Sequence, residues 1–557
     1  MDLSNSIRKQ PYYRFYYNVF LTLLSGIIFP LSLPNELFLF GHPGLGIICL
    51  VPYIIALIHT SKFKEATLLG VLFGAVSTLL SSYWLVAFGD FSIWTLGGTT
   101  LGYMLYNAML SPFLLFVLRS KPQVRPFLFA LLWASYEFLK SSGYLAYPWG
   151  LIVYPINTIL PLMQIADITG PWGISFLMAF TNALTAEAIL LLKEKGAVTR
   201  GLLKTYFARS AAFWLIIVSA ILLYGGFRLN MEYRNEGTLR IVLVQQNIDP
   251  WQTGMREDTS LETGVRLSQE GLEQGHADIV SWCETAFRRP YSSEPHSFYG
   301  THPEDTSFLE LVKQSNTYYL IGAPHWINRE ELQISNAVLL IRPDSRIEDY
   351  YAKQHPVPFA ETAPLWEIPA VQNFYRNVIG LHSQGWTMGD RDTIFTIPLE
   401  EGGTLSFATP ICFEDAFGYL CSRMIREGAQ MLINLTNDSW SKTYSAETQH
   451  FVAARLRSIE NRRTLIRSTN GGYTTIIAPS GEVTHSMEMF TADSIHAEVP
   501  VLTTENFTVY TVLGDYLPKA FLIILLLFLL LVRISNTGRF RFLQKYWLFY
   551  EQGHNNR

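Results

Sequence analysis

Long apolar runs are the feature of this sequence that most restricts its fold. They crowd into the first 230 residues, and one further run stands alone near the C-terminus. A helix that crosses a bilayer needs about 20 apolar residues, because lipid offers its backbone no hydrogen-bond partners. The runs therefore predict a polytopic α-helical membrane bundle with about eight spans. These candidate spans are residues 17–33, 36–58, 66–88, 91–118, 126–140, 171–192, 211–228 and 517–532.

The composition agrees with a membrane protein. Only 16% of the residues are charged, against about 25% in soluble proteins, and 49% are hydrophobic. The net charge of -4 supplies no basic surface for a polyanion, so we expect no nucleic-acid partner. Of the four cysteines, Cys283, Cys412 and Cys421 share one polar region in which they cannot all pair, whereas Cys49 is in an apolar run. We therefore expect no disulfide framework.

Basic residues gather on every second connection between the spans. Because Lys and Arg are enriched on cytoplasmic loops, this alternation predicts that both termini are cytoplasmic. The long segment 229–516 then lies outside the cytoplasm. The basic residues in question are Arg8, Lys9 and Arg14, then Lys62 and Lys64, then Arg119, Lys121 and Arg125, then Lys193, Lys195, Arg200, Lys204 and Arg209, and finally Arg533, Arg539, Arg541 and Lys545.

The outer segment has the pattern of an α/β domain, because short β-branched runs alternate with stretches of helical periodicity. We predict three parts of the chain: a membrane bundle at 1–230, an outer α/β domain at 231–510, and a final span with a cytoplasmic tail at 511–557. The predicted strands are 239–247, 278–282, 318–323, 336–342, 404–409, 431–435, 464–468 and 474–478. The predicted helices are 259–274, 306–316, 415–428 and 447–461.

Cys412 is the candidate nucleophile of this outer domain. It follows the apolar run 403–408 and precedes the helical stretch 416–427, so it lies at a strand-to-helix turn. Unpaired N–H groups and the helix dipole at such a turn favour the thiolate, which is the reactive form of cysteine. The alternative is that Cys412 is a small buried hydrophobic residue.

Two further residues near strand ends would supply the base and the cation that attack by a thiol on a carbonyl needs. Glu284 would accept the thiol proton of Cys412 and later return it to a leaving group. Lys353 would lower the pKa of the thiol and stabilise the oxyanion of a tetrahedral intermediate, with a backbone N–H near Phe413 as second donor. Taken singly, a Glu or Lys at a strand end is more often a solvated surface charge.

Five segments together resemble the nitrilase superfamily, and within it the membrane-embedded apolipoprotein N-acyltransferase family. The resemblance covers nearly the whole chain, because the arrangement of several spans, an outer domain and one last span is also that of the family. The segments are Trp282-Cys283-Glu284-Thr285, Lys353-Gln354-His355-Pro356-Val357-Pro358-Phe359-Ala360-Glu361, Ile411-Cys412-Phe413-Glu414, Leu435-Thr436-Asn437-Asp438-Ser439-Trp440 and Arg467-Ser468-Thr469-Asn470-Gly471-Gly472.

The resemblance implies a nitrilase-like α-β-β-α sandwich with a Glu-Lys-Cys triad, here Glu284, Lys353 and Cys412. It implies transfer of an acyl chain from a phospholipid to Cys412, and then to the N-terminal α-amino group of S-diacylglyceryl-cysteine on an apolipoprotein. The expected setting is the bacterial inner membrane, with the catalytic domain on the periplasmic side. We expect membrane lipids as partners, a monomer, no cofactor and no metal.

The resemblance also assigns supporting residues. Glu361 and Glu414 match acidic positions around the triad, and Trp149 and Trp251 match aromatic positions near the lipid entrance. The chain departs from the family at Phe413, where Tyr is usual. It also departs at Ser441-Lys442, where an aromatic residue and Gly are usual, and at Cys283, which we expect to be an inert buried thiol.

Several polar residues have plainer interpretations. We expect His355 and His450 to be packing or surface residues. Five arginines look like a solvated helix face with ion pairs to Glu447 and Glu460, and contact with lipid phosphates is the alternative. No His/Cys cluster has the spacing of metal ligands. The arginines are Arg455, Arg457, Arg462, Arg463 and Arg467.

Fusion of a bundle to an enzyme suits substrates that are held in the bilayer by about 0.8 kcal/mol per buried methylene. We expect outer loops near Trp149 and Trp251 to frame a lateral entrance for them. Two rival functions remain open. A membrane-anchored nitrilase-like amidohydrolase would use the same triad on a small amide, without phospholipid. A transporter or scaffold with a degenerate domain would not need the intact Glu284, Lys353 and Cys412.

Overall fold

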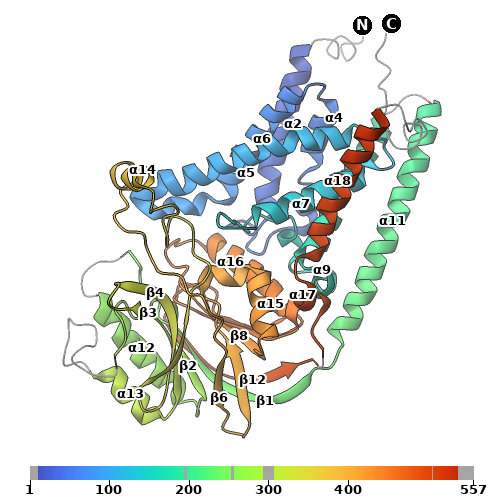
Figure 1. Ribbon diagram of the computed structural model, residues 1–557. Coiled ribbons are helices and arrows are strands. Elements are labelled where there is room, and N and C mark those ends of the chain that lie inside the picture. The colour runs from blue at the N-terminus through green and yellow to red at the C-terminus, as the bar shows by residue number, and fades with distance from the viewer. Residues whose placement is uncertain (1–10, 194–196, 252–255, 293–305, 505, 537–557) are drawn as a thin grey trace. The chain divides into compact units, whose positions relative to one another are not determined.

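The computed structural model describes residues 11–193, 197–251, 256–292, 306–504 and 506–536. These residues form two compact units (Figure 1). The first unit comprises the described residues of Met1–Ser142, Ala146–Phe227 and Asp515–Arg557. The second comprises those of Gly143–Leu145 and Arg228–Gly514. The predicted domain boundaries, near residues 230 and 510, remain predictions.

The first unit is helical. In the part of the chain that the structure describes, six helices are long and apolar enough to cross a membrane. Their apolar composition and length agree with the predicted bundle, because each can satisfy its backbone hydrogen bonds internally. They are contained in α2 (Pro11–Ser32), α5 (Phe63–Ser81), η2 with α6 (Ile93–Gly97 and Gly98–Leu118), α10 (Pro171–Lys193), α11 (Ala197–Leu229) and α18 (Tyr516–Asn536).

The other two predicted spans correspond to shorter helices. The run 36–58 contains α3 (Pro43–Gly46) and α4 (Val51–His59), and the run 126–140 is α7 (Arg125–Lys140). Pro and Gly interrupt the first run, so no single helix extends through it. The count of eight spans therefore stays a prediction. The remaining short elements of this unit are η1 (Tyr83–Phe91), η3 (Tyr154–Ile156), α8 (Leu160–Met163) and α9 (Ala166–Thr169).

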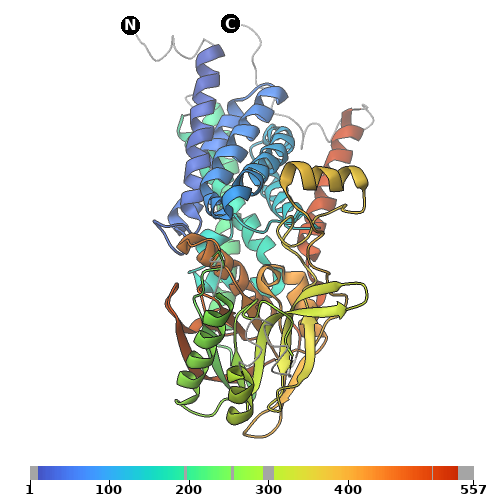
Figure 2. The same ribbon diagram turned by 90° about the vertical axis from the view of Figure 1, so that its left-hand side faces the viewer.

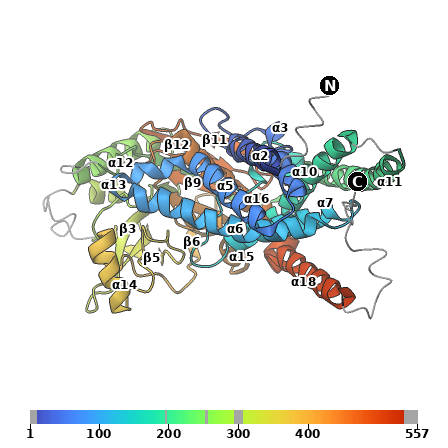
Figure 3. The same ribbon diagram turned by 90° about the horizontal axis from the view of Figure 1, so that it is seen from above.

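Small residues let two helices of the bundle approach closely. Helix α5 packs along α6 and α2, and Figure 3 shows the three running together. A Cβ atom added at Gly70 of α5 would lie 2.1 Å from the hydroxyl of Ser111 and 2.2 Å from the carbonyl of Asn107. Small residues at helix interfaces allow this contact in membranes, where packing rather than hydrophobicity holds helices together.

The second unit contains two six-stranded sheets among its described residues. Both are mixed, with parallel pairs in the middle and antiparallel pairs toward the edges. The first sheet has the order β12-β1-β2-β3-β4-β5, and the second the order β11-β10-β9-β8-β7-β6. The strands are β1 (Arg234–Gln245), β2 (Ile279–Ser281), β3 (Tyr318–Asn328), β4 (Gln333–Ile341), β5 (Ile347–Ala352), β6 (Phe395–Pro398), β7 (Thr404–Ala408), β8 (Met431–Thr436), β9 (Leu465–Thr469), β10 (Thr475–Ile477), β11 (Val483–Ser486) and β12 (Asp493–Thr503).

The two sheets face each other, and helices cover their outer sides (Figures 1 and 2). Helix α12 (Arg256–Leu272) packs on β1 and β12 of the first sheet, and α13 (Ser307–Ser315) packs on α12 and shares the core with that sheet. Helix α16 (Tyr444–Asn461) packs on β9 of the second sheet, beside α15 (Gly418–Arg426). Between the sheets, the hydroxyl of Ser468 donates to the carbonyl of Ser281 at 3.1 Å. This confirms the predicted α-β-β-α sandwich. The other described elements of this unit are α14 (Pro369–Phe374), η5 (Tyr375–Ile379), η6 (Cys412–Ala416) and α17 (Val509–Leu513).

Candidate active site

Glu284 lies in a turn directly after β2 and is buried. Its Oε1 accepts from the side-chain amide of Asn336 at 2.7 Å, and its Oε2 accepts from the backbone N–H of Asn437 at 3.0 Å. The turn packs closely on β3, because a Cβ atom at Gly322 would lie 2.5 Å from the Cα of Glu284. The absence of a side chain at Gly322 therefore lets the backbone of Glu284 pack against β3.

Lys353 follows β5 and is fully buried. Its backbone N–H donates to the carbonyl of Asn336, and its carbonyl accepts from Gly389. Its Nζ donates to Oε1 of Glu361 at 2.8 Å and lies 3.4 Å from Oε1 of Glu284. The ammonium is thus held between two carboxylates, so the interpretation of Lys353 as a solvated surface charge does not apply.

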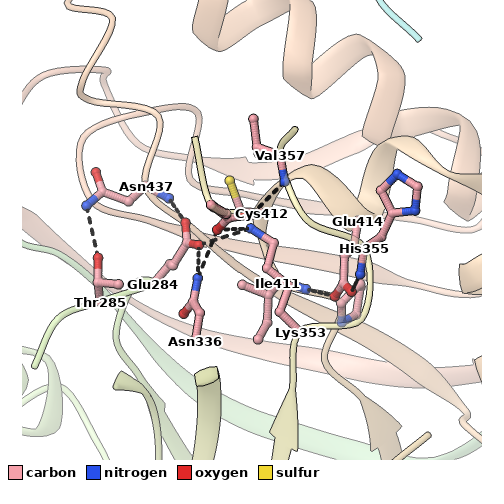
Figure 4. A network of polar contacts seen from close by, with 12 residues as sticks. Glu284, Thr285, Asn336, Lys353, His355, Val357, Ile411, Cys412, Glu414 and Asn437 are labelled. Carbon is pink, nitrogen blue, oxygen red and sulfur yellow. Dashed lines mark hydrogen bonds and ion pairs between the residues drawn. The ribbon is translucent and has the colours of Figure 1, made fainter. Parts of the chain in front are cut away.

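Cys412 begins η6, directly after the segment that leaves β7. Its backbone is left-handed (φ 49°), a region in which a non-glycine residue is strained and which occurs often at functional sites. The amide of Asn434 on β8 donates to the carbonyls of Pro410 and Cys412 and supports the turn. Figure 4 shows the sulfur of Cys412 beside the carboxylate of Glu284 and the ammonium of Lys353.

The electrostatics of the site favour a resting thiol. Burial raises the pKa of Cys412 and the Glu284 carboxylate raises it further, whereas Lys353 opposes them. The prediction that the turn would hold a thiolate is therefore wrong, because burial and a neighbouring anion outweigh the cation and the helix end. Burial also raises the pKa of Glu284, which makes this carboxylate a stronger base for the thiol proton.

The supporting glutamates have distinct places. Oε2 of Glu361 accepts from the backbone N–H of Val357 at 2.7 Å, which directs its Oε1 to Lys353. Glu414 is fully buried and accepts the N–H groups of Gln354 and His355 on one oxygen and that of Ile411 on the other. Burial raises the pKa of Glu414 to about 7. Glu414 therefore ties the Lys353 segment to the Cys412 turn.

The three aromatic candidates belong to different units: Phe413 and Trp251 to the second, and Trp149 to the first. The ring of Phe413 is buried against Phe417, at 4.8 Å between ring centroids. Trp251 belongs to the second unit, is 46% exposed, and donates through Nε1 to the carbonyl of Trp440 at 2.8 Å. Trp149 belongs to the first unit and is buried. A role of Trp149 and Trp251 in lipid entry stays a prediction.

Trp149 lines a small cavity within the helical unit. The cavity has a volume of about 30 Å³. Its polar wall includes Lys140, whose Nζ donates to the carbonyl of Trp149 at 2.6 Å. Its aromatic wall includes Tyr147, whose ring stacks on that of Trp149 with centroids 5.7 Å apart. The indole is thus held in a defined orientation.

His450 is a packing residue, which is one of the two expected outcomes, whereas the expectation of a solvated arginine face is wrong. His450 is buried, with both ring nitrogens within 2.7 Å of carboxylate oxygens. The arginine run is not a solvated face, because all five guanidinium side chains are largely buried. Ion pairs from this run to Glu447 and Glu460 were predicted, and the pair to Glu460 is present, formed by Arg457 at 2.7 Å. Periodicity correctly placed Arg455, Arg457 and His450 on a helix, but it gave no sign that α16 is buried along almost its whole length.

For some residues of the site, the sequence predicted no role. Asn336 bonds both Glu284 and Glu361, yet nothing near it in β4 distinguishes it from an ordinary strand residue. Asp438 and Arg467 lie within two of the segments that resemble the nitrilase superfamily, and that position was the available signal. In the described part of the chain, no group of three or more His, Cys, Asp and Glu side chains could hold a metal ion. That the reaction uses no cofactor stays a prediction.

Comparison with known proteins gives two family matches. The model of the apolipoprotein N-acyltransferase N-terminal domain matches residues 25–184, and that of carbon-nitrogen hydrolase matches residues 240–507. Among relatives, apolipoprotein N-acyltransferase 2 of Treponema denticola is 38% identical over 95% of this chain and 100% of its own length.

Two further relatives agree over most of the chain. Apolipoprotein N-acyltransferase 2 of Treponema pallidum is 35% identical over 86% of this chain and 88% of its own. Apolipoprotein N-acyltransferase of Borreliella burgdorferi is 32% identical over 94% and 96%. With identity at this level along both the helical unit and the sandwich, the chain belongs to the apolipoprotein N-acyltransferase family.

Proposed function

We propose that this protein transfers a fatty acyl chain from a phospholipid to the N-terminal α-amino group of S-diacylglyceryl-cysteine on apolipoproteins. The product is a triacylated lipoprotein, and the intermediate is a thioester on Cys412. One observation carries the proposal: in a chain of this family, Glu284, Lys353 and Cys412 meet in a single buried cluster. A nucleophile, a base and a cation in contact are the parts that acyl transfer needs.

In the first half-reaction, Glu284 takes the thiol proton of Cys412 as the sulfur attacks the ester carbonyl carbon of the phospholipid. The tetrahedral intermediate collapses, and its carbon–oxygen ester bond breaks. The departing lysophospholipid alkoxide receives the proton from Glu284. Because burial raises the pKa of both groups, Glu284 is suited to accept this proton and to give it back.

Lys353 stabilises the oxyanion of that intermediate. Burial alone would lower the pKa of Lys353, but Glu361 and Glu284 outweigh it and raise the pKa above its ordinary value. The side chain therefore remains an ammonium throughout turnover. The backbone N–H of Phe413 serves as the second donor, and such donors act strongly in a site without water.

In the second half-reaction, the free α-amino group of the apolipoprotein attacks the thioester carbonyl. Glu284 takes a proton from the attacking nitrogen, and the bond from carbon to the sulfur of Cys412 breaks. The proton then returns to the sulfur, which restores the resting thiol. No redox step or cofactor enters this sequence.

The substrates explain the helical unit. Phospholipid and diacylglyceryl-apolipoprotein are both anchored by acyl chains, whose removal into water costs about 0.8 kcal/mol per methylene. We place the protein in the bacterial inner membrane as a multi-pass monomer, with the sandwich on the periplasmic side and both termini in the cytoplasm. The alternation of basic loops supports this orientation. Trp149 and Trp251 are assigned to lipid entry.

The test is the intact mass of the purified protein in phospholipid micelles, beside Cys412→Ser. We expect a gain of one fatty-acyl mass in the wild type, no gain in the variant, and loss of the added mass when a diacylglyceryl-cysteine peptide is supplied. Folded wild-type protein that never gains this mass contradicts the proposal. Hydrolysis of a small amide without phospholipid would instead identify an amidohydrolase.

A further inference from the structure

A buried cluster of charges beside Cys412 has no part in the mechanism above. It consists of two aspartates, a histidine and an arginine, each of them at least nine-tenths buried. Removing charged groups from water is costly unless they pair with one another, so such a cluster needs a reason to exist. Its members are Asp415, Asp438, His450 and Arg467.

His450 is the centre of the cluster. Its Nδ1 lies 2.6 Å from Oδ2 of Asp438, and its Nε2 lies 2.7 Å from Oδ1 of Asp415. A neutral imidazole donates through one nitrogen only, and carboxylates cannot donate while ionised. Two hydrogen bonds to two carboxylates therefore require the imidazolium form.

The surrounding charges agree with that form. Burial alone would lower the pKa of His450, but Asp438 and Asp415 outweigh it and raise the pKa to about 9. Arg467 faces both aspartates from β9, with its Nε 3.1 Å from Oδ2 of Asp415. Glu447, one turn earlier on α16, also faces the cluster, and burial and Asp438 raise its pKa. Within the four-residue cluster, the imidazolium of His450 and the guanidinium of Arg467 thus balance two aspartate carboxylates.

The cluster reaches both partners of the proton transfer. Asp438 follows β8, and its Oδ1 accepts from the sulfur of Cys412 at 3.9 Å. The residue before it, Asn437, donates its backbone N–H to Glu284. Asp415 lies in η6, three residues after Cys412. The histidine side chain therefore joins the turn that carries the nucleophile to the loop that holds the base.

We propose that His450 is a positioning residue, whose imidazolium bonds Asp415 and Asp438 at once and thereby fixes the sulfur of Cys412 against the carboxylate of Glu284. The inference rests on the proposed function, because it acts through these two groups. It concerns the geometry of the thiol proton transfer and adds no chemical step.

The arrangement also gives the thiol proton one destination. The Cys412 sulfur lies near two carboxylates, those of Glu284 and Asp438. Burial alone would raise the pKa of Asp438, but His450 and Arg467 outweigh it and lower the pKa. Asp438 thus orients the S–H group without accepting its proton, which passes to Glu284.

The test compares three variants by the single-turnover rate of acyl-enzyme formation, measured by intact mass between pH 6 and 10. His450→Gln removes the charge, and His450→Arg keeps a cation that can donate to both aspartates. His325→Gln, on β3 and remote from these contacts, is the matched control. Thermal unfolding of each protein in micelles verifies that it is folded.

We expect wild type to lose acylation rate as pH rises through about 9, because one ring nitrogen then turns a lone pair toward a carboxylate. His450→Gln should acylate about 100-fold more slowly with no such decline, since misplacement by about 1 Å costs that much. His450→Arg should retain most of the rate at pH 7 and keep it at pH 10. His325→Gln should behave as wild type.

Three outcomes overturn the inference. They are a wild-type rate without a decline near pH 9, a His450→Gln rate equal to that of wild type, or a decline that persists in His450→Arg. If His450→Gln does not fold, the wild-type profile and His450→Arg still decide. If the wild type does not acylate at any pH, the proposed function itself is overturned. The experiment therefore distinguishes failure of the proposed function from failure of the positioning role of His450.

Discussion

Each ionisable side chain of the site owes its state to partners from other strands. Lys353 shows this most clearly, because its ammonium is fully buried yet lies between Glu284 and Glu361. Without Glu361, the ammonium would pair with Glu284 alone. That pairing would hold the carboxylate of Glu284 more tightly and lower its pKa, so the second glutamate helps to keep Glu284 able to accept the thiol proton.

This predicts that Glu361→Gln slows acyl-enzyme formation by about 10- to 100-fold, the equivalent of a charge-assisted hydrogen bond of about 1.5–3 kcal/mol. The acylation time course by intact mass measures it. Glu367→Gln is the control, because among the described residues this neighbouring glutamate accepts a hydrogen bond from Gln384 in an exposed contact and has no contact with the triad. Equal rates for the two variants would refute the role of Glu361.

His450 leads to a second prediction, about stability. Its pKa is about 9 in the folded protein and about 6.5 in an unfolded chain. The raised pKa means that the folded state binds the proton more tightly than the unfolded state does. Protonation of His450 therefore adds its full contribution to the free energy of unfolding below pH 6.5, and this contribution is lost as pH rises through 9. Its size is about 3 kcal/mol.

The unfolding temperature of wild type should therefore exceed that of His450→Gln at pH 6, and the gap should shrink toward pH 10. Thermal unfolding in micelles, followed by intrinsic fluorescence, measures the gap at each pH. The difference in unfolding temperature between wild type and His325→Gln should not shrink from pH 6 to pH 10. A gap for His450→Gln that stays constant from pH 6 to 10 would contradict the assignment of the imidazolium.

At the scale of elements, close approach decides the packing of both units. In the sandwich, Gly322 admits the turn of Glu284 to β3. In the bundle, Gly70 lets α6 pack close to α5, because an added Cβ would lie 2.2 Å from the carbonyl oxygen of Asn107. A flexible side chain can move aside for an added methyl group, but a backbone carbonyl cannot, so the helices themselves must separate.

Gly70→Ala should accordingly destabilise the bundle by about 1–3 kcal/mol and lower its unfolding temperature. The control is Gly102→Ala on α6, where an added Cβ meets nothing within 4 Å. That change should leave stability unaltered or raise it by up to about 1 kcal/mol, since Ala is the better helix former. Equal unfolding temperatures for the two variants would exclude close α5–α6 packing.

At the scale of the whole molecule, the question is how a bilayer substrate meets a buried thiol. The proposed answer assigns Trp149 of the helical unit to lipid entry and not to chemistry. The choice of substrate can separate a role in lipid entry from a role in catalysis. A soluble short-chain ester can acylate Cys412 without first leaving the bilayer. Trp149 is buried and stacked on Tyr147, so its replacement also removes packing.

Trp149→Ala should slow acylation by phospholipid at least about 10-fold, while acylation by a soluble p-nitrophenyl ester stays near the wild-type rate. Trp149→Phe, which keeps an aromatic ring, should lose less. Intact mass measures the first reaction and nitrophenolate release the second. An unchanged rate on phospholipid would remove Trp149 from lipid entry, and an equal loss on both substrates would show a general structural defect.

The sequence by itself determined what depends on local pattern. Apolar runs of sufficient length identified the six long helices, and β-branched runs identified eight of the strands, including those that precede Glu284 and Cys412. Strands β5, β6, β11 and β12 were not predicted. They are short or polar along one face, and only pairing with a neighbouring strand makes them regular.

Tertiary structure alone decided the states of the charged groups. Packing of α16 and β9 buried five arginines and His450, and burial with Glu284 raised the pKa of Cys412 where a helix end suggested the reverse. Residue type and spacing identify which groups can do chemistry. Their pKa values and partners depend on distances between strands and helices far apart in the chain, and these distances exist only once the two sheets have packed together.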